Sequence, residues 1–99
     1  MIKLLMSWDI RPGKEAEYME FVSREFTPQM MELGIQPTEA WYMVVGNGPQ
    51  VLAGGIAKDR ETMTGILESE GWEGLEAKLL GYVRNYHYKV VPATGQFQL

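Results

Sequence analysis

Apolar and polar residues alternate along residues 1–11, and this alternation predicts the first element of the chain. Every second residue from Ile2 to Ile10 is apolar, whereas most of the residues between them are polar. Successive side chains of a strand point to opposite faces, so the pattern predicts a strand that is buried on one face. Pro12 ends it, because proline has no amide hydrogen for another sheet hydrogen bond.

Residues 13–33 change to a spacing of three and four residues, which is the period of an amphipathic helix. The apolar residues at this spacing are Tyr18, Val22, Phe26, Met30 and Leu33. Pro28 falls inside the helix and removes a hydrogen bond, so we expect a kink or a restart there with Thr27 as the cap. Gly34 predicts the end of the helix, since glycine readily takes the left-handed conformation of a C-terminus.

Two further apolar runs, at residues 36–45 and 50–57, are predicted to form a hairpin. The residues between them, 46–49, contain an Asn-Gly pair, which is typical of a tight turn. Both runs carry apolar residues on both faces. Adjacent glycines, Gly54 and Gly55, indicate that something approaches the second strand closely: a helix side chain, a partner subunit or a ligand.

The last third of the chain is predicted to contain helical turns and a final strand. Asp59 and Ser69 are expected to cap two short helices or one broken helix, the later part covering residues 70–80 and closed by Gly81. A run rich in aromatic and β-branched residues then predicts a strand over residues 82–91. Residues 93–99 remain as a tail.

The predicted order, β-α-β-β-α-β, is that of an α+β ferredoxin-like sandwich in a single domain, residues 1–99. In this fold both helices cover the same face of the sheet, and the first and third strands lie at its centre. The other face would expose a large apolar patch, which a soluble monomer rarely tolerates. We therefore expect a homodimer through the open sheet face; a different protein or a small ligand are the alternative covers.

Composition narrows the choice of partners and compartment. The net charge is -4 and the 9 basic residues are scattered, which disfavours nucleic acid and an RNA-binding sheet of the same topology. Cysteine is absent, which excludes disulfides and thiolate sites and favours a cytoplasmic protein. No long apolar run is present, so we expect neither a signal peptide nor contact with a membrane.

Two stretches resemble the dimeric α/β-barrel superfamily, in particular its NIPSNAP-like and antibiotic-biosynthesis-monooxygenase-like members. They are WDIRPGKEAEYMEFV, at the end of the first strand and the start of the helix, and SEGWEGLEAKLLGYVRNYHYKVV, in the late helix and final strand. The resemblance implies a ferredoxin-like dimeric barrel. It leaves the activity open, because the superfamily includes cofactor-free oxygenases, haem-degrading enzymes, lyases, isomerases and proteins of unknown role.

The resemblance also implies candidate ligand-binding residues. Oxygenase members hold a phenolic or polycyclic substrate in a pocket between sheet and helices, lined by an aromatic residue, an asparagine and a histidine or tyrosine. The residues that match these roles or lie near them are Trp8, Trp41, Tyr42, Tyr86 and Asn85. The same aromatics are as compatible with a core or a dimer seam. Haem-degrading members carry an axial histidine on the late helix; residues 70–80 contain none, so no cofactor is expected.

His87 is the only histidine, and its side chain has the only unperturbed pKa near neutrality. Together with Asn85 it is the candidate catalytic pair, His87 acting as a general base. The alternative is a polar residue on the solvent side of an edge strand. The acidic run of Glu68, Glu70, Glu73 and Glu76 is expected to be a solvated helix face, so no metal site is predicted.

Two hypotheses follow from the sequence. One is a homodimer that binds a hydrophobic small molecule in a pocket between sheet and helices, with cofactor-free oxygenase-like chemistry as its enzymatic extension. The other is a non-catalytic structural or interaction module whose aromatics form the dimer seam. The first is favoured if at least three of five residues converge on one cavity: Trp8, Trp41, Asn85, Tyr86 and His87.

Overall fold

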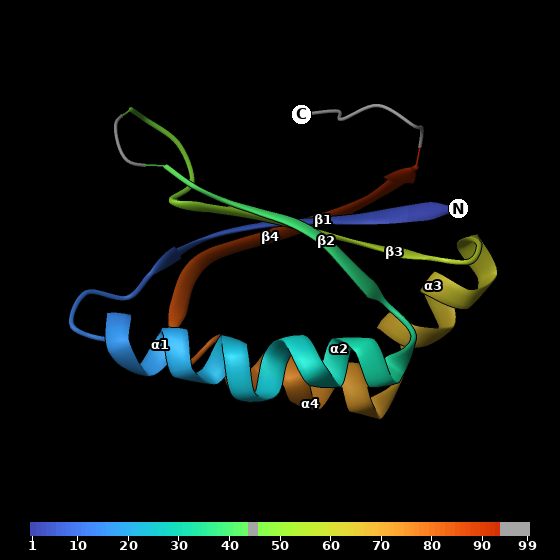
Figure 1. Ribbon diagram of the computed structural model, residues 1–99, viewed down its shortest axis with the longest axis horizontal. Helices are drawn as coiled ribbons and strands as arrows, with labels where there is room; N and C mark the ends of the chain where they lie inside the picture. Colours follow the sequence, from blue (N-terminus) through green and yellow to red (C-terminus); the bar gives the residue numbers. More distant parts are fainter. Residues whose placement is uncertain (44–45, 94–99) are drawn as a thin grey trace.

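A four-stranded antiparallel sheet in the order β2-β3-β1-β4 organises the chain, and the helices lie on one of its faces (Figure 1). The structure is a computed structural model that describes residues 1–43 and 46–93. Its elements are β1 (Ile2–Ile10), α1 (Glu15–Phe21), the π-helical segment η1 (Val22–Phe26), α2 (Thr27–Leu33), β2 (Gln36–Tyr42), β3 (Val51–Ala57), α3 (Arg60–Leu67), α4 (Glu70–Leu79) and β4 (Val83–Pro92). This order confirms the predicted ferredoxin-like α+β fold, with β1 and β3 at the centre of the sheet.

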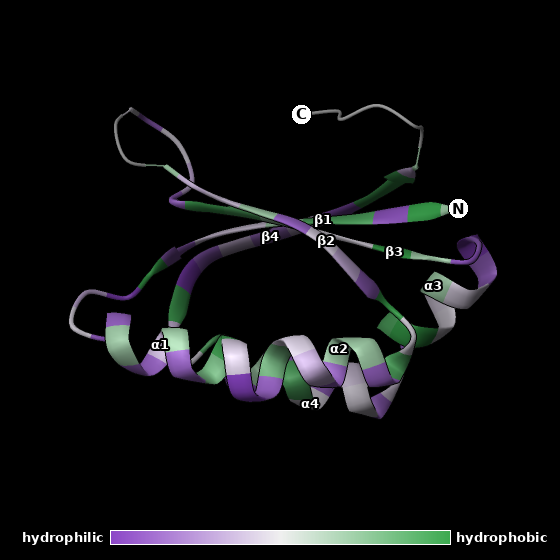
Figure 2. Cartoon of the chain, viewed as in Figure 1, coloured by the Kyte–Doolittle hydropathy of each residue, from purple (hydrophilic) through white to green (hydrophobic). Residues whose placement is uncertain are grey.

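Burial alternates along the whole length of strand β1, as the sequence predicts. In Figure 2 the same strand is mostly hydrophobic in colour, interrupted by hydrophilic positions. Its even-numbered residues face the helices and are buried, and its odd-numbered residues lie partly exposed on the open face. The side chains of β1 meet a core that gathers residues from every helical segment: Tyr18, Phe21, Phe26, Met30, Met63, Ile66, Trp72, Leu75 and Leu79. Burial of this face is the main source of stability, since apolar burial dominates folding.

A kink or a restart is predicted near Pro28, and the long first helix does depart from regular α-helical geometry just before it, at η1, but Thr27 does not cap a new helix. Thr27 has helical backbone angles, φ -64° and ψ -48°, and its amide donates to the carbonyl of Val22, five residues earlier. Such a bond defines a π-turn, which is wider than an α-turn. The wider turn comes just before Pro28, where a regular α-helix would press the proline ring against the preceding turn. The helix therefore continues through Pro28 without a new cap.

The other predicted boundaries hold within a few residues. Gly34 ends α2 in the left-handed conformation at φ 109°. The side chains of Asp59 and Ser69 accept hydrogen bonds from backbone amides at the starts of α3 and α4. Gly81 follows α4 without a positive φ, because the helix already ends at Leu80 in a right-handed conformation. The predicted strand end at 44–45 and most of the tail, 94–99, lie outside the described residues.

Each of the adjacent glycines of β3 admits a neighbouring side chain on a different face of the sheet. A Cβ atom on Gly55 would lie 2.6 Å from Cγ2 of Ile35 and 2.9 Å from Cε of Met30, both in the core. On the open face, a Cβ atom on Gly54 would lie 2.7 Å from a carboxylate oxygen of Glu39. The predicted approach of a helix side chain is observed at Gly55, through Met30 of α2, whereas the side chains next to Gly54 come from the neighbouring strands β1 and β2.

Candidate functional site

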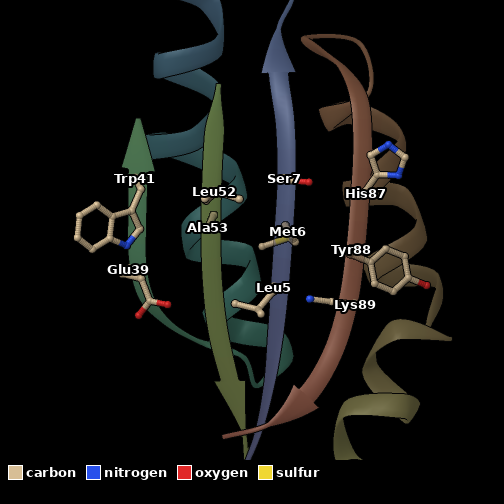
Figure 3. A pocket seen from close by; sticks show the side chains of 10 residues that line it. All are labelled: Leu5, Met6, Ser7, Glu39, Trp41, Leu52, Ala53, His87, Tyr88 and Lys89. Carbon is tan, nitrogen blue, oxygen red and sulfur yellow. The ribbon is translucent and has the colours of Figure 1, made fainter. Parts of the chain in front are cut away.

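Two hollows flank the sheet, one on each face. The first, which we call the helix-side cavity, has a volume of about 300 Å³ and lies between the sheet and the α1-η1-α2 helix. Its main lining residues are Trp8, Tyr18, Val22, Phe26, Met30 and Tyr42. The second, the open-face groove, measures about 320 Å³ and crosses all four strands (Figure 3). Side chains of Leu5, Ser7, Glu39, Trp41, Leu52, His87 and Lys89 line it.

The helix-side cavity exists because both of its walls depart from regular structure. Tyr18, Val22, Phe26 and Met30 stand four residues apart, and three such steps would rotate a side chain by about 120° around an α-helix of about 3.6 residues per turn. The π-helical segment takes up more residues per turn and keeps all four on the cavity side. Opposite them, the pairing of β2 with β3 shifts register between Pro37 and Ala40. This bulge follows from the missing amide of proline on an edge strand.

The aromatic wall of the helix-side cavity contains a buried hydrogen bond. The indole Nε1 of Trp8 donates to the hydroxyl oxygen of Tyr18 over 3.0 Å, and the two rings meet edge to face with centroids 6.4 Å apart. Burial raises the pKa of Tyr18, with a smaller contribution from Tyr42 in the same direction. Tyr18 is therefore a neutral phenol, and a buried phenol needs partners for both its oxygen and its proton.

Tyr42 closes the outer end of the same cavity. It is 47% exposed, and its hydroxyl donates to the sulfur of Met19 on α1 over 3.9 Å. The contact joins the edge strand β2 to the first helix. Two smaller hydroxyls, those of Thr27 and Thr38, also belong to lining residues. The lining of this cavity thus combines a large apolar surface with a few hydroxyl groups, which is the usual composition of a small-molecule pocket.

Tyr86 lies on the helix side but belongs to the packed core. Its ring stands 6.2 Å from that of Trp8, and its hydroxyl donates to a carboxylate oxygen of Glu76 on α4 over 2.8 Å. Burial and the Glu76 carboxylate both raise the pKa of Tyr86, so this tyrosine also stays neutral. The bond fixes β4 to α4, and Tyr86 does not line the helix-side cavity.

His87 and Trp41 lie on the opposite face of the sheet (Figure 3). His87 pairs with Ser7 across β1 and β4, and Trp41 pairs with Leu52 across β2 and β3. Both side chains are exposed, Trp41 at 55%. In the described chain, therefore, the imidazole and the helix-side cavity are separated by the sheet itself.

Asn85 has a structural partner at the edge of the open face. It occupies a bulge in β4 with a φ of 56°, and its amide donates to the carboxylate of Asp9 over 2.8 Å. The backbone amide of Gln50 donates to the other oxygen of Asp9 over 2.8 Å. These bonds lower the pKa of Asp9, the Asn85 bond having the largest effect. Asn85 is therefore engaged in joining the strands.

The six predicted site residues are divided among several environments. Trp8 and Tyr42 line the helix-side cavity, Trp41 and His87 line the open-face groove, Tyr86 is in the core, and Asn85 is in the bulge. The convergence of three of the five named residues on one cavity does not occur. The alternation within each strand was readable from the sequence, but the register that places Trp41 beside Leu52 was not.

Sequence reasoning missed three residues of the helix-side cavity as site residues: Tyr18, Thr27 and Thr38. The available signal was the unbroken series of four-residue steps from Tyr18 to Met30, because three such steps drift by about 120° around a regular α-helix and a π-turn corrects this drift. Such turns frequently mark functional sites. Thr38 had no comparable signal.

The described residues contain neither a metal-binding cluster nor a membrane-spanning helix. Within residues 1–43 and 46–93, no group of three histidine, cysteine, aspartate or glutamate side chains could hold a metal ion. None of the helices in those ranges has the length and apolar content that crossing a bilayer requires.

The sheet order, the helices on one face and the cavity between the layers define a class of small ferredoxin-like α+β proteins. No protein-family model matches the sequence, and no curated protein matches it. Comparison with solved structures finds the same fold in NIPSNAP-domain and monooxygenase-like proteins, which confirms the predicted resemblance in fold.

Three solved structures illustrate this likeness. An uncharacterised NIPSNAP domain protein from Burkholderia xenovorans has 14% identity and a TM-score of 0.72, with 99% of this chain and 100% of that one covered. HapK from Hahella chejuensis has 9% identity and a TM-score of 0.78, over 100% and 98% of the two chains. A protein of Nitrosomonas europaea, provisionally assigned as an antibiotic biosynthesis monooxygenase, has 9% identity and a TM-score of 0.66 over 94% and 98%. At these identities the likeness establishes the fold.

Proposed function

We propose that the protein binds a small apolar molecule, about one or two rings in size, in the helix-side cavity. The observation that carries the proposal is a volume of about 300 Å³ with aromatic and aliphatic walls. This volume is at the lower end of the range for ligand pockets, and the walls combine apolar surface with a few hydroxyls, as ligand pockets commonly do. The π-helical segment supports the same proposal, because it keeps four large side chains on the wall of the cavity. In a regular α-helix these four side chains would not all face the cavity.

Binding, rather than catalysis, is the function that the geometry favours. The candidate general base His87 lies on the opposite face of the sheet from the cavity, and Asn85 bonds to Asp9. A general base must come within hydrogen-bonding reach of the proton that it takes. The cavity itself offers phenol and threonine hydroxyls, which suit the recognition of a ligand.

We further propose that a second copy of the chain covers the open face of the sheet. The face has an apolar centre made by Leu5, Leu52 and Ile56, with the exposed indole of Trp41 beside it. Polar residues lie around this centre, among them the ion pair of Lys3 and Glu39. An apolar centre with a polar rim is the usual anatomy of a protein interface, and a two-fold axis would apply it to both copies. The absence of cysteine supports a cytoplasmic location for this dimer.

A thermal-shift panel of quinones, phenols and fatty acids tests ligand binding, because a ligand that binds only the folded state raises the melting temperature. The informative variant is Ala53→Leu, which fills the cavity from β3. Ala77→Leu is the matched control, since it adds the same atoms at an exposed position on α4. We expect at least one compound to raise the melting temperature of the wild type and of Ala77→Leu, and not that of Ala53→Leu. No shift with any compound, or an equal shift in Ala53→Leu, would contradict the proposal.

A non-catalytic interaction module is the second candidate function. The observation that favours it is the division of the predicted site residues between the core and the open face, with Trp41 exposed where a partner would sit. This candidate is supported if no compound of the panel raises the melting temperature and the chain nevertheless sediments as a dimer.

A further inference from the structure

Met19 combines an exposed thioether with a hydrogen bond that joins two elements. Its side chain is 52% exposed on α1, and its sulfur accepts the hydroxyl proton of Tyr42, at the end of β2, over 3.9 Å. An oxidant in solution reaches an exposed sulfur more readily than a buried one. The side chains of Met6, Met30 and Met63, by contrast, are exposed by 3% or less. Met19 therefore belongs to the methionines of this chain that an oxidant can reach.

The strand that Met19 contacts is paired on one side only. Within the described ranges β2 is an edge strand that pairs with β3, and this pairing shifts register between Pro37 and Ala40. The contact between Tyr42 and Met19 adds a link from the C-terminal end of β2 to the first helix. Tyr42 also lines the helix-side cavity, so the link lies at the outer end of that cavity. A change in its strength therefore acts on both the edge strand and the cavity.

The sulfur of Met19 is a weak acceptor, and oxidation would replace it with a stronger one. Thioethers accept hydrogen bonds weakly, whereas a methionine sulfoxide carries a polar oxygen on the sulfur. That oxygen stands one bond length from the sulfur. On the side of Tyr42 it would shorten the 3.9 Å gap toward the about 2.5–3.0 Å of an O–H···O hydrogen bond. Both side chains are about half exposed, which leaves them room for this adjustment.

We propose that Met19 is a site of reversible oxidation by hydrogen peroxide, and that its sulfoxide oxygen accepts the hydroxyl proton of Tyr42 and holds β2 to α1. In the reaction a lone pair of the sulfur attacks one peroxide oxygen, so that an S–O bond forms while the O–O bond breaks. The departing hydroxide takes the proton of the transferred oxygen and becomes water. The sulfur loses two electrons, and the peroxide gains them. Sulfoxide reductases restore the thioether, which makes the change reversible.

The modification would make the outer end of the helix-side cavity respond to an oxidant. Tyr42 lines the cavity, and a stronger link to Met19 would restrict the movement of its ring away from the first helix. This consequence for ligand access rests on the proposed binding function. The modification itself does not, so it is tested in the protein without a ligand.

Peptide mapping by mass spectrometry after mild treatment with hydrogen peroxide measures the oxidation of each methionine. We expect Met19 to be oxidised several-fold faster than the buried Met6, Met30 and Met63. Protection of Met19 to the same degree as these three would overturn the proposal.

The effect of the sulfoxide is measured as the change in melting temperature on peroxide treatment. Met19→Leu removes the sulfur, and Met31→Leu is the matched control, because Met31 is 51% exposed on α2 and does not line the cavity. Relative to Met19→Leu, we expect treatment to raise the melting temperature of the wild type and of Met31→Leu by about 2–4 °C, the range for a partly exposed hydrogen bond in a domain of this size. No rise in the wild type relative to Met19→Leu would overturn the proposal.

Tyr42→Phe removes the donor and leaves the thioether in place. We expect Met19 to be oxidised in this variant as in the wild type, but without the rise in melting temperature. Tyr88→Phe should keep the rise, since Tyr88 is 49% exposed on the other edge strand and does not line the cavity. An equal rise in the wild type and in Tyr42→Phe would overturn the assigned hydrogen bond. A thermal-shift panel without any shift would count against ligand binding alone.

Discussion

The two faces of the sheet differ in burial and in packing, although the same four strands form both. On the helix side, the even-numbered residues of β1 are buried in a core of interlocking rings, and Gly55 lets Ile35 and Met30 reach the backbone. On the open side, the odd-numbered residues remain partly exposed, and Gly54 makes room for the ion pair of Lys3 and Glu39. The difference teaches that stability is concentrated on one face, which leaves the other face free to be shaped by a partner.

The hollows on the two faces differ in the same sense. The helix-side cavity is walled mainly by buried rings, and the hydroxyl oxygen of Tyr18 accepts a hydrogen bond from the Trp8 indole. The open-face groove is floored by strand residues and edged by charged and polar side chains. The helix-side cavity has the walls and the few polar groups that orient a small molecule. The open-face groove has the broad apolar area and polar rim that suit contact with another protein.

Truncation of a residue on each face gives the largest expected contrast. Leu4 is fully buried and its neighbour Leu5 is only partly buried on the open side. We expect Leu4→Ala to lower the free energy of unfolding by about 2–5 kcal/mol, because it removes buried methyl groups and leaves a cavity. Leu5→Ala should cost clearly less in dilute protein. Urea denaturation of both variants measures the difference, and similar losses would show that the open face is already covered in the dilute chain.

A charged residue introduced at the centre of the open face is expected to weaken the dimer without preventing the chain from folding. Leu52→Glu would place an unpaired carboxylate in the proposed dimer seam, which costs about 3 kcal/mol and weakens the dimer more than a hundredfold. The circular dichroism spectrum should be unchanged, since Leu52 does not contribute to the buried core. Sedimentation analysis of the wild type and the variant measures the dissociation constant of each dimer. A wild-type chain that sediments as a monomer at micromolar concentration would contradict the dimer.

The adjacent glycines of β3 compare the two faces at a finer scale. Gly55→Ala would press a methyl group against the packed core, so we expect a loss of about 1–3 kcal/mol in the free energy of unfolding. On the open face, the added methyl group of Gly54→Ala meets the ends of the Lys3 and Glu39 side chains and the hydroxyl of Thr38. These are side-chain ends at a partly exposed surface, so we expect them to move aside at a cost of less than about 1 kcal/mol. Thermal denaturation of the two variants checks the ranking. A larger loss for Gly54→Ala would mean that the ion pair contributes more than core packing at this point.

The fold was predictable because its signals are local and repeated. Alternation along β1, the N-caps at Asp59 and Ser69 and the left-handed glycine at Gly34 each depend on a few neighbouring residues. The order of the elements then leaves few topologies open. The π-turn was not predicted, because the irregularity was ascribed to Pro28 as a kink or a restart, although the unbroken series of four-residue steps from Tyr18 to Met30 carried the information.

The site was less predictable because it depends on relations between strands. Each strand reveals which of its residues share a face, but a shift of one residue in pairing exchanges the faces. The registers that put Trp8 and Trp41 on opposite sides of the sheet include bulges in both β2 and β4. The link between Trp8 and Tyr18 likewise joins β1 to α1, and no local pattern in the sequence specifies that contact.

The pH dependence of Asp9 gives the smallest expected effect and tests how the open face is held together at its edge. Hydrogen bonds from Asn85 and from the Gln50 amide lower the pKa of Asp9 below its ordinary value of 3.8. A carboxyl whose pKa is lower in the folded state stabilises the protein above its unfolded pKa, and this contribution disappears as the pH falls through the folded pKa. The melting temperature of the wild type should therefore exceed that of Asp9→Asn near neutral pH, and the difference should shrink below about pH 4. Asp59 also has a lowered pKa, but it is present in both proteins, so its contribution cancels in the comparison. A difference that stays constant down to about pH 2 would mean that the Asp9 charge contributes nothing, and that the bulge at Asn85 is held by backbone pairing alone.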